Sequence, residues 1–476
     1  MATSKLISCF LFAIVLTSCS QKIGTKLPLS LHPDNPHYFM FRGEPVILIG
    51  STEHYGAVMN LDFDYIKYLD EIAESGLNIT RTFTGVYVES AGAFGISKNS
   101  LAPDPGRFIC PWARSTESGY SNGGSKFDLT KWDEAYFVRL KDFIAQAGKR
   151  NIIVELDLFS NFYDTIQWKL SPLNEINNIN GIGNVKDHKE VLTLRHDEIL
   201  AEQEKMVRKI ITELKDFKNL YYEVCNEPYF GDTLALREWE IHMTGIIADA
   251  EKDFKYKHLI SNNVHNFRKL VPVPRQHVSI YNFHYAEPPV TVPMNYHLKC
   301  PVGDNETGFR GIEGDIYRVE AWRFILAGGA LFNHLDYSFT IDNEDGTYVV
   351  KKGQPGAGSR ELRDQFSLLS GFMSKLNFVN MRPVTDEDVR TGINGASING
   401  LVEAEKAWAL YLSLKDTVKV STTLEVNLPE GSYDIKWLDT KTGTETSESQ
   451  NGHNGGWIQV RSPEYLHDLA LLIRRK

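Results

Sequence analysis

The sequence predicts a (β/α)8 TIM barrel followed by a small antiparallel β-sandwich. Over residues 32–381, short apolar segments alternate with amphipathic helical patterns, which is typical of a parallel sheet covered by helices. From residue 382 the pattern changes to closely spaced strands separated by turn residues. The length of 476 residues is sufficient for these two domains and a targeting segment.

The barrel strands are predicted from apolar runs that are rich in β-branched and aromatic residues. Helices are predicted where apolar residues recur at i, i+3, i+4 and i+7, and they end at glycine or before turn signals. Eight repeats favour a closed barrel over an open sheet. The predicted strands are 46–49, 77–82, 152–157, 220–225, 259–263, 278–283, 300–305 and 330–335. The predicted helices are 63–75, 129–150, one that ends near 217, 234–254, 315–326 and 361–376.

Two long loops interrupt the alternation after the second and third strands. The first, residues 84–128, is rich in glycine, serine and proline and contains aromatic residues. Loops of this length are usually functional or disordered, and the aromatic content favours a functional role. Flat rings in these loops and near the strand ends could stack on sugars or simply pack; the candidates are Trp112, Tyr120, Tyr163, Trp168 and Tyr229.

The C-terminal strands are predicted at 407–414, 423–428, 432–438, 457–460 and 469–473. Two glycine-containing segments, 429–431 and 454–456, are expected to be turns between them. Trp408, Trp437 and Trp457 are expected in the core of this domain; the alternative is a carbohydrate-binding face.

Residues 1–18 have the pattern of a signal peptide. Lys5 precedes an apolar stretch, 6–16, that is too short to span a membrane. The segment 16–19, Leu-Thr-Ser-Cys, resembles a bacterial lipobox, which predicts lipidation of Cys19 after cleavage. We therefore expect an exported, membrane-anchored lipoprotein, periplasmic or at the cell surface, with a tether over 19–31; the alternative is an ordinary signal peptide with a chance cysteine.

Charge and cysteine content narrow the function classes. A net charge of −10 argues against binding to nucleic acid or to an anionic membrane surface, so membrane contact is expected only through the lipid anchor. Cys110, Cys225 and Cys300 are expected as unpaired, mostly buried thiols; the alternative in an exported protein is a disulfide. No Cys/His spacing indicates a metal site, and we expect no metal and no cofactor.

The most informative residues follow the predicted strands. Asn226-Glu227-Pro228 ends the fourth, and Glu306 ends the seventh. In a barrel the C-terminal ends of the strands converge on one face, where substrates bind. Two carboxylates on that face are the minimum needed to break a glycosidic bond, because one donates a proton while the other attacks or activates water. The remaining polar residues at these ends are Arg81, Thr82, Asp157, His284, Tyr285 and Asp336.

With these residues in this order, residues 32–380 resemble clan A glycoside hydrolases of the family 5-like kind, which are retaining barrel enzymes. The resemblance implies a carbohydrate substrate, with Glu227 as acid/base and Glu306 as nucleophile. It also implies that Asn226 donates to the sugar 2-hydroxyl and that Arg81 keeps the nucleophile ionised. A tyrosine after the sixth strand would bind the nucleophile; because His284 and Tyr285 are adjacent here, which ring does so is left open.

Structural roles remain open for several of these residues. Asp304 and Glu313 are alternative nucleophiles, and Arg81 could be a structural ion-pair partner. His284 could be a structural histidine, while Asp157 and Asp336 could cap loops or bind sugar; Trp112 and Trp168 are retained as candidate substrate contacts.

We therefore predict a retaining hydrolase of β-linked glycans. The first alternative is a non-catalytic glycan-binding lipoprotein on the same barrel. The second is a metal-dependent peptidase or deacetylase, which needs a cluster of ligands at the strand ends; His54, His284 and His334 are the histidines that qualify. The separation of the two carboxyl groups decides the stereochemistry, since about 5–5.5 Å indicates retention and about 6.5–9.5 Å inversion.

Overall fold

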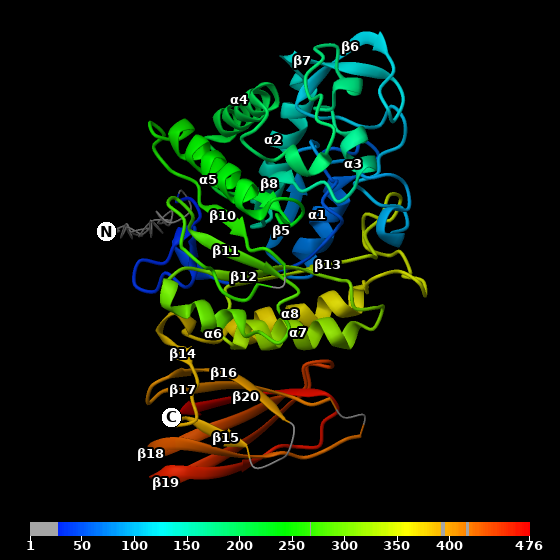
Figure 1. The fold of residues 1–476 in the computed structure, drawn as a ribbon. Helices are drawn as coiled ribbons and strands as arrows, with labels where there is room; N and C mark the ends of the chain where they lie inside the picture. Colours follow the sequence, from blue (N-terminus) through cyan, green and yellow to red (C-terminus); the bar gives the residue numbers. More distant parts are fainter. Residues whose placement is uncertain (1–26, 267, 392–395, 416–417) are drawn as a thin grey trace, which may run out of the picture.

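The computed structural model describes residues 27–266, 268–391, 396–415 and 418–476. A barrel packs on a smaller antiparallel sheet domain, with helices α7 (Gly314–Leu326) and α8 (Arg360–Ser374) between them (Figure 1). The predicted signal peptide and Cys19 lie outside the described residues. Within the described ranges, no helix combines the length and apolarity needed to cross a membrane.

The barrel prediction is confirmed. Eight parallel strands pair in the order β4-β13-β12-β11-β10-β9-β8-β5. Asn78 closes the seam between β4 and β5, because its N–H donates to the Ile49 carbonyl at 3.1 Å and its side-chain oxygen accepts from the Ile49 N–H at 2.8 Å. The strands are β4 (Leu48–Thr52), β5 (Ile79–Phe83), β8 (Ile153–Ser160), β9 (Leu220–Asn226), β10 (Ile260–Asn263), β11 (Ile280–His284), β12 (Val302–Thr307) and β13 (Leu331–Leu335).

Helices cover the outer face of the barrel (Figure 1). Aspartates cap four of them: the carboxylates of Asp64, Asp133, Asp164 and Asp232 accept from backbone N–H groups of the first turn. Besides α7 and α8, the helices are α1 (Tyr65–Glu74), α2 (Glu134–Lys149), α3 (Thr165–Leu170), α4 (Asp197–Leu214), α5 (Thr233–Ala250) and α6 (Thr291–Asn295).

The long loop after β5 differs from the prediction. It contains the hairpin β6 (Trp112–Ser118) and β7 (Ser125–Trp132), and α2 begins five residues later than expected because Asp133 caps it. This hairpin packs on the loop after β8: the Tyr120 hydroxyl donates to the Leu170 carbonyl at 2.9 Å. Together the two loops form a side lobe beside the barrel (Figure 1).

The C-terminal domain is a seven-stranded antiparallel sheet, as expected for its fold class, with two differences. The predicted turns at 429–431 and 454–456 lie inside two long paired strands, and a bulge between Gly431 and Tyr433 accommodates the first. Strands 382–383, 389–391 and 397–403 were not predicted. The strands are β14 (Arg382–Pro383), β15 (Val389–Thr391), β16 (Ser397–Glu403), β17 (Ala407–Ser413), β18 (Thr423–Leu438), β19 (Glu445–Arg461) and β20 (Asp468–Arg475).

Three smaller predictions agree with the structure only in part. Cys110, Cys225 and Cys300 are free and buried, as expected, although Cys300 precedes β12 instead of lying in it. The tether was predicted to extend to residue 31, but Leu29 is buried and β1 (Ser30–Leu31) pairs with β2 (Phe39–Phe41), which pairs in turn with β3 (Glu44–Val46). Trp408 and Trp437 are in the sheet-domain core, whereas Trp457 is 39% exposed.

Candidate active site

A cavity of about 290 Å³ opens at the C-terminal ends of the barrel strands. Its volume is at the lower limit of pockets that bind small molecules, about 300–1,000 Å³. Most of its wall is aromatic. The lining residues are His54, Tyr55, Phe83, Tyr87, Glu89, Phe94, Leu101, Tyr163, Asn226, Glu227, Tyr229, Phe230, Tyr285, Glu306 and Phe309.

Glu227 and Glu306 face each other in this cavity. Each is 5% exposed, and one carboxylate oxygen of each, together with a ring nitrogen of His284, lies within 4.8 Å of the others. Glu306 lies within β12, whereas Glu227 follows β9 with φ of 50°. A non-glycine residue in that left-handed region is uncommon, and here it turns the Glu227 side chain toward the cavity beside Asn226.

A left-handed backbone conformation also determines which ring after β11 binds Glu306, the candidate nucleophile. Adjacent residues of a strand point to opposite faces, but Tyr285 has φ of 56°. Both side chains therefore reach the site: the Tyr285 hydroxyl donates to Glu306 Oε1 at 2.8 Å, and His284 Nδ1 lies 2.9 Å from Glu227 Oε1.

Glu306 is held by donors suited to an anion. The hydroxyl of Tyr55 donates to its Oε2 at 2.9 Å, and Arg81 Nη1 donates to the same oxygen at 3.1 Å. With the Tyr285 contact, three donors converge on this carboxylate. These contacts fix the orientation of the Glu306 carboxylate in the cavity.

Glu227 accepts four hydrogen bonds. Asn266 and His284 bind Oε1, at 2.6 and 2.9 Å, while the hydroxyls of Tyr163 and Tyr229 donate to Oε2 at 2.7 and 2.9 Å. Burial favours the neutral carboxyl, but the hydrogen bond and charge of His284 and the other donors lower the pKa of Glu227 to about 2. In the free protein Glu227 is therefore ionised.

His284 is the group placed to supply the proton that an acid at Glu227 needs. Burial lowers the pKa of this imidazole, but the charge of Glu306 and the hydrogen bond to Glu227 outweigh it, so the pKa lies above the ordinary 6.5. Nδ1 is also 3.6 Å from Glu306 Oε1. His284 thus lies between the two carboxylates, within direct proton-transfer distance of Glu227.

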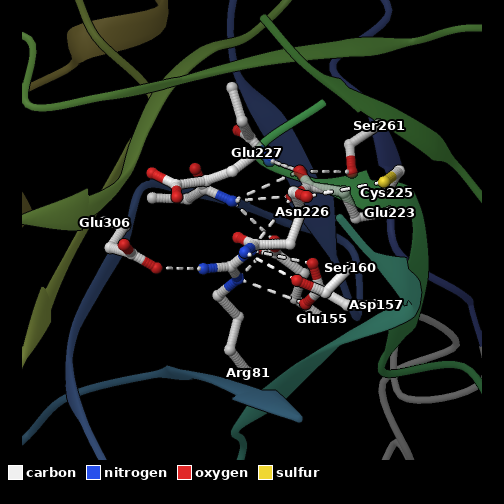
Figure 2. A network of polar contacts seen from close by, with 12 residues as sticks. Arg81, Glu155, Asp157, Ser160, Glu223, Cys225, Asn226, Glu227, Ser261 and Glu306 are labelled. Atoms are coloured by element: carbon white, nitrogen blue, oxygen red, sulfur yellow. Dashed lines mark hydrogen bonds and ion pairs between the residues drawn. The ribbon is translucent and has the colours of Figure 1, made fainter. Parts of the chain in front are cut away.

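Arg81 is fully buried, next to Glu306 and Asn226 (Figure 2), and is not part of the cavity lining. Its guanidinium contacts Glu155, Asp157 and Glu223 at 2.8–3.0 Å on one side and Glu306 on the other. It also donates to Asn226 Oδ1 at 2.9 Å, which orients that amide. Arg81 therefore acts through Glu306 and Asn226 and has no surface for direct contact with a ligand.

One cation cannot balance this cluster if every carboxylate is ionised. Burial and the neighbouring Glu223 charge raise the pKa of Glu155 to about 7 despite Arg81, and burial raises the pKa of Asp157 well above its ordinary value. The cluster therefore retains protons near neutral pH. The Tyr221 hydroxyl and the Asn305 amide also donate to Glu155.

Several predicted substrate contacts do not line the cavity. Trp112 is fully buried and stacks on Trp132 in the side lobe, and the Trp168 indole N–H donates to the Val185 carbonyl at 3.0 Å. Both rings serve the packing of the lobe, so they are not available to stack on a ligand. Tyr120 is buried there too, whereas Tyr163 and Tyr229 do line the cavity.

Two predicted acidic contacts are also structural. Asp157 is fully buried against Arg81, and Asp336, which directly follows β13, accepts from Ser51, Ser338 and Arg363. Neither alternative nucleophile reaches the cavity: Asp304 is 1% exposed and accepts from the Ala286 N–H, and Glu313 precedes α7. Thr82 is likewise buried and absent from the lining.

The sequence patterns missed the contributions of the first strand and of the loop after β5. Tyr55, with φ of 58°, follows β4 and binds Glu306. The run Glu53-His54-Tyr55 directly after an apolar strand was the available signal. Glu89 and Phe94 lie deep in a long loop, where no local pattern indicates that they return to the cavity.

The donor pattern at the two carboxylates argues against a metal centre. Among the described residues, Glu227, His284 and Glu306 form one of two groups whose ligand atoms could surround an ion, and Glu155, Asp157 and Glu223 form the other. Seven N–H or O–H donors already occupy the oxygens of Glu227 and Glu306, and Arg81 lies beside each group. His54 is not in either group, and His334 contacts Thr307 and the Ala357 carbonyl.

No protein-family model and no curated protein matches the sequence. Among solved structures, one described as a glycoside hydrolase is similar with a TM-score of 0.62 at 13% identity, over 95% of this chain and 97% of that chain. A glycoside hydrolase family 5 protein from Bacteroides vulgatus ATCC 8482 gives 0.60 at 13% identity, over 94% and 93%. The chain therefore shares the fold of these proteins through both of its domains.

Proposed function

We propose that this protein is a retaining glycoside hydrolase that cleaves β-linked glycans. The observation that carries the proposal is the approach of Glu227 and Glu306, whose nearest ligand oxygens lie within 4.8 Å. This separation is close to the roughly 5–5.5 Å of retaining enzymes and too short for an attacking water molecule between them. The fold shared with a glycoside hydrolase family 5 protein supports the proposal.

In the first step, a Glu306 oxygen attacks the anomeric carbon. A glycosyl ester bond forms, the glycosidic C–O bond breaks, and the leaving oxygen takes a proton from Glu227. Since Glu227 is ionised in the free protein, we assign the supply of that proton to His284, 2.9 Å away. Neutralisation of Glu306 by the new bond removes one of the two anions that hold the proton on His284.

In the second step, Glu227 accepts a proton from water as the water oxygen attacks the same carbon. The ester bond to Glu306 breaks and the sugar leaves with its original configuration. Tyr55, Tyr285 and Arg81 stabilise the carboxylate that departs, since they already bind it in the free protein.

Chemical rescue separates the two carboxylates. With an activated aryl β-glycoside and azide, Glu227→Ala should give the β-glycosyl azide, and Glu306→Ala should give the α-glycosyl azide. Both variants should lose at least about 10³-fold in kcat without azide, while the control Glu313→Ala should retain full activity. Identical azide products from both variants would contradict the assignment.

The wild-type product distinguishes the mechanism directly. NMR during hydrolysis of defined oligosaccharides should show the β-anomer first. An α-anomer first would indicate inversion, and binding of the oligosaccharides without cleavage would favour the glycan-binding alternative.

We further propose export as a lipoprotein anchored through Cys19, on the basis of the segment 16–19 and the apolar stretch before it. Cys19→Ala should move the protein from the membrane fraction to the soluble fraction and abolish incorporation of labelled fatty acid. Unchanged fractionation would contradict the anchor.

A further inference from the structure

The cavity lining contains one cluster of polar side chains that does not hydrogen-bond to Glu227 or Glu306. Tyr55, Tyr163, Tyr229 and Tyr285 direct their hydroxyls at Glu227 or Glu306, and Asn226 is bound by Arg81. The hydrogen-bonding side chains that remain in the lining are His54, Tyr87 and Glu89. The rest of the wall is apolar: Phe83, Phe94, Leu101, Phe230 and Phe309.

These three side chains form one rigid unit. Glu89 accepts from the Tyr87 hydroxyl at 2.9 Å and from the Asn99 amide, and its Oε2 lies 3.5 Å from His54 Nε2. The Glu89 backbone N–H donates to the Leu101 carbonyl, which fixes the loop. The unit is therefore positioned before any ligand arrives, as a specificity element must be.

One atom of this unit lacks a partner. His54 Nδ1 is buried and makes no hydrogen bond to any described residue. Leaving a buried polar atom unpaired costs about 1–3 kcal/mol, and such atoms in native sites often await a ligand or water. Burial lowers the pKa of His54, but the charges of Glu89 and Glu306 and the contact with Glu89 outweigh it, so the pKa lies above its ordinary value.

The charges of the lining exclude an acidic sugar. It contains three carboxylates, from Glu89, Glu227 and Glu306, and no lysine or arginine. Arg81 is not part of the lining and is surrounded by carboxylates. A uronate, sulfate or phosphate group would therefore meet negative charge with no lysine or arginine in the lining to balance it.

We infer that His54, oriented by Glu89, binds a hydroxyl of the sugar ring attacked by Glu306 and restricts the site to uncharged sugars. The inference rests on the proposed function. The small cavity places His54 and the catalytic pair around the same ring, because the His54 ring stacks on Tyr55, which itself binds Glu306. His54 is thus a substrate-binding residue that no family pattern in the sequence indicated.

The experiment compares wild type with His54→Gln and Glu89→Gln on 4-nitrophenyl β-glycosides of glucose, galactose, mannose, xylose and glucuronic acid. His242→Gln is the matched control, because His242 pairs with Glu204 at 2.7 Å outside the cavity. Thermal melting confirms that each variant is folded. Glu89→Gln provides a second test of His54 if His54→Gln is unstable.

We expect His54→Gln to lower kcat/KM on the preferred neutral sugar by about 10- to 100-fold, the value of one charge-assisted hydrogen bond. The loss should nearly vanish on the monodeoxy analogue that lacks the recognised hydroxyl. His242→Gln should change nothing. A loss below about 2-fold on every neutral sugar and every deoxy analogue, or preference for the glucuronide, would overturn the inference.

Calorimetric titration of the same glycosides separates this inference from the proposed function. If wild type cleaves none of them, the proposed function fails, and the titration alone decides the inference. Weaker binding of a neutral glycoside to His54→Gln than to wild type then supports it. Equal binding to both, or no binding to either, overturns it.

Discussion

Two buried arginines occupy comparable surroundings and have different consequences. Arg318 joins the barrel to the sheet domain: it pairs with Asp315 and Asp468, and Asp468 also accepts from Tyr411 and Thr440. Arg81, in the active-site cluster, faces four carboxylates. Both side chains are at most 1% exposed. Burial is therefore common to the structural and the active-site cluster, and the excess of negative charge distinguishes the second.

This difference explains how each cluster accommodates its buried charge. The Arg318 cluster satisfies its charges with neutral donors, so it can serve as a fixed joint between domains. In the Arg81 cluster, buried carboxyl groups keep protons, which reduces the negative charge that must be buried. The fourth carboxylate, Glu306, keeps donors that stabilise an anion and faces the cavity. We expect changes at Arg81 to affect catalysis first and changes at Arg318 to affect stability first.

Arg81→Met should produce the largest effect. Without the guanidinium, Glu306 loses a stabilising donor and Asn226 its orientation, so kcat should fall by about 10²–10³-fold. The buried carboxylates also lose their cation, which should reduce the free energy of unfolding by about 3–5 kcal/mol. Steady-state kinetics and urea unfolding measure both. Arg81→Lys, which restores charge without the planar fork, should recover stability better than activity; activity within tenfold of wild type in Arg81→Met would refute the role.

Arg318→Met should reverse that pattern. Removing one partner of the buried pair with Asp468 should reduce the free energy of unfolding by about 3–5 kcal/mol. Activity per folded molecule should stay within about 2-fold, because the interface lies away from the strand ends that form the cavity (Figure 1). Urea unfolding and kinetics at low temperature test this. A large fall in kcat with little change in stability would show that the comparison is wrong.

Glu155 gives the pH dependence of the active-site cluster. Its pKa is raised to about 7 in the folded protein against an ordinary value near 4.5, so the folded state binds the proton more tightly. Its contribution to stability is therefore complete below about pH 4.5 and is lost as the pH rises through 7. Glu155→Gln keeps an acceptor for Arg81 and removes the titration.

The measurement is urea unfolding of wild type and Glu155→Gln at pH 5 and pH 8. Wild type should lose stability relative to the variant by an amount on the order of 1–3 kcal/mol over that range. Parallel curves for the two proteins would mean that Glu155 is ionised throughout and that another member of the cluster holds the proton.

The sequence was sufficient for the barrel because each strand is a continuous apolar run, such as Leu220–Cys225, and because the strand ends of such a fold meet at one face. That rule alone brings Arg81, Glu227, His284, Tyr285 and Glu306 together, as observed. It failed where conformation depends on distant contacts. Trp112 has the composition of a stacking platform, but the hairpin that carries it packs on the loop after β8 and buries the ring.

Dependence on distant contacts also explains why two turns were predicted wrongly and why some cavity residues were not predicted. Glycines at 431 and 455 normally indicate turns, yet pairing between β18 and β19 continues across both positions with a bulge. Glu89 and Phe94 return to the cavity only because the loop after β5 is held by contacts such as that of Glu89 with Leu101. A local pattern contains no information on such contacts.

A third arginine, Arg390, is exposed, and its contact is expected to contribute least to the free energy of unfolding. Its guanidinium lies 4.1 Å from the ring centre of Trp457 on β19. Because both partners remain in solvent, Trp457→Ala should change the free energy of unfolding by about 0.5–1 kcal/mol and leave hydrolysis unaltered. Trp437→Ala, at a ring that is 3% exposed in the same domain, should cost about 3–5 kcal/mol. Equal destabilisation of the two variants would mean that Trp457 has a buried role that its exposure does not indicate. If Trp457→Ala instead weakened glycan binding, the exposed face of β19 would be a second carbohydrate contact, separate from the cavity where the excess negative charge is found.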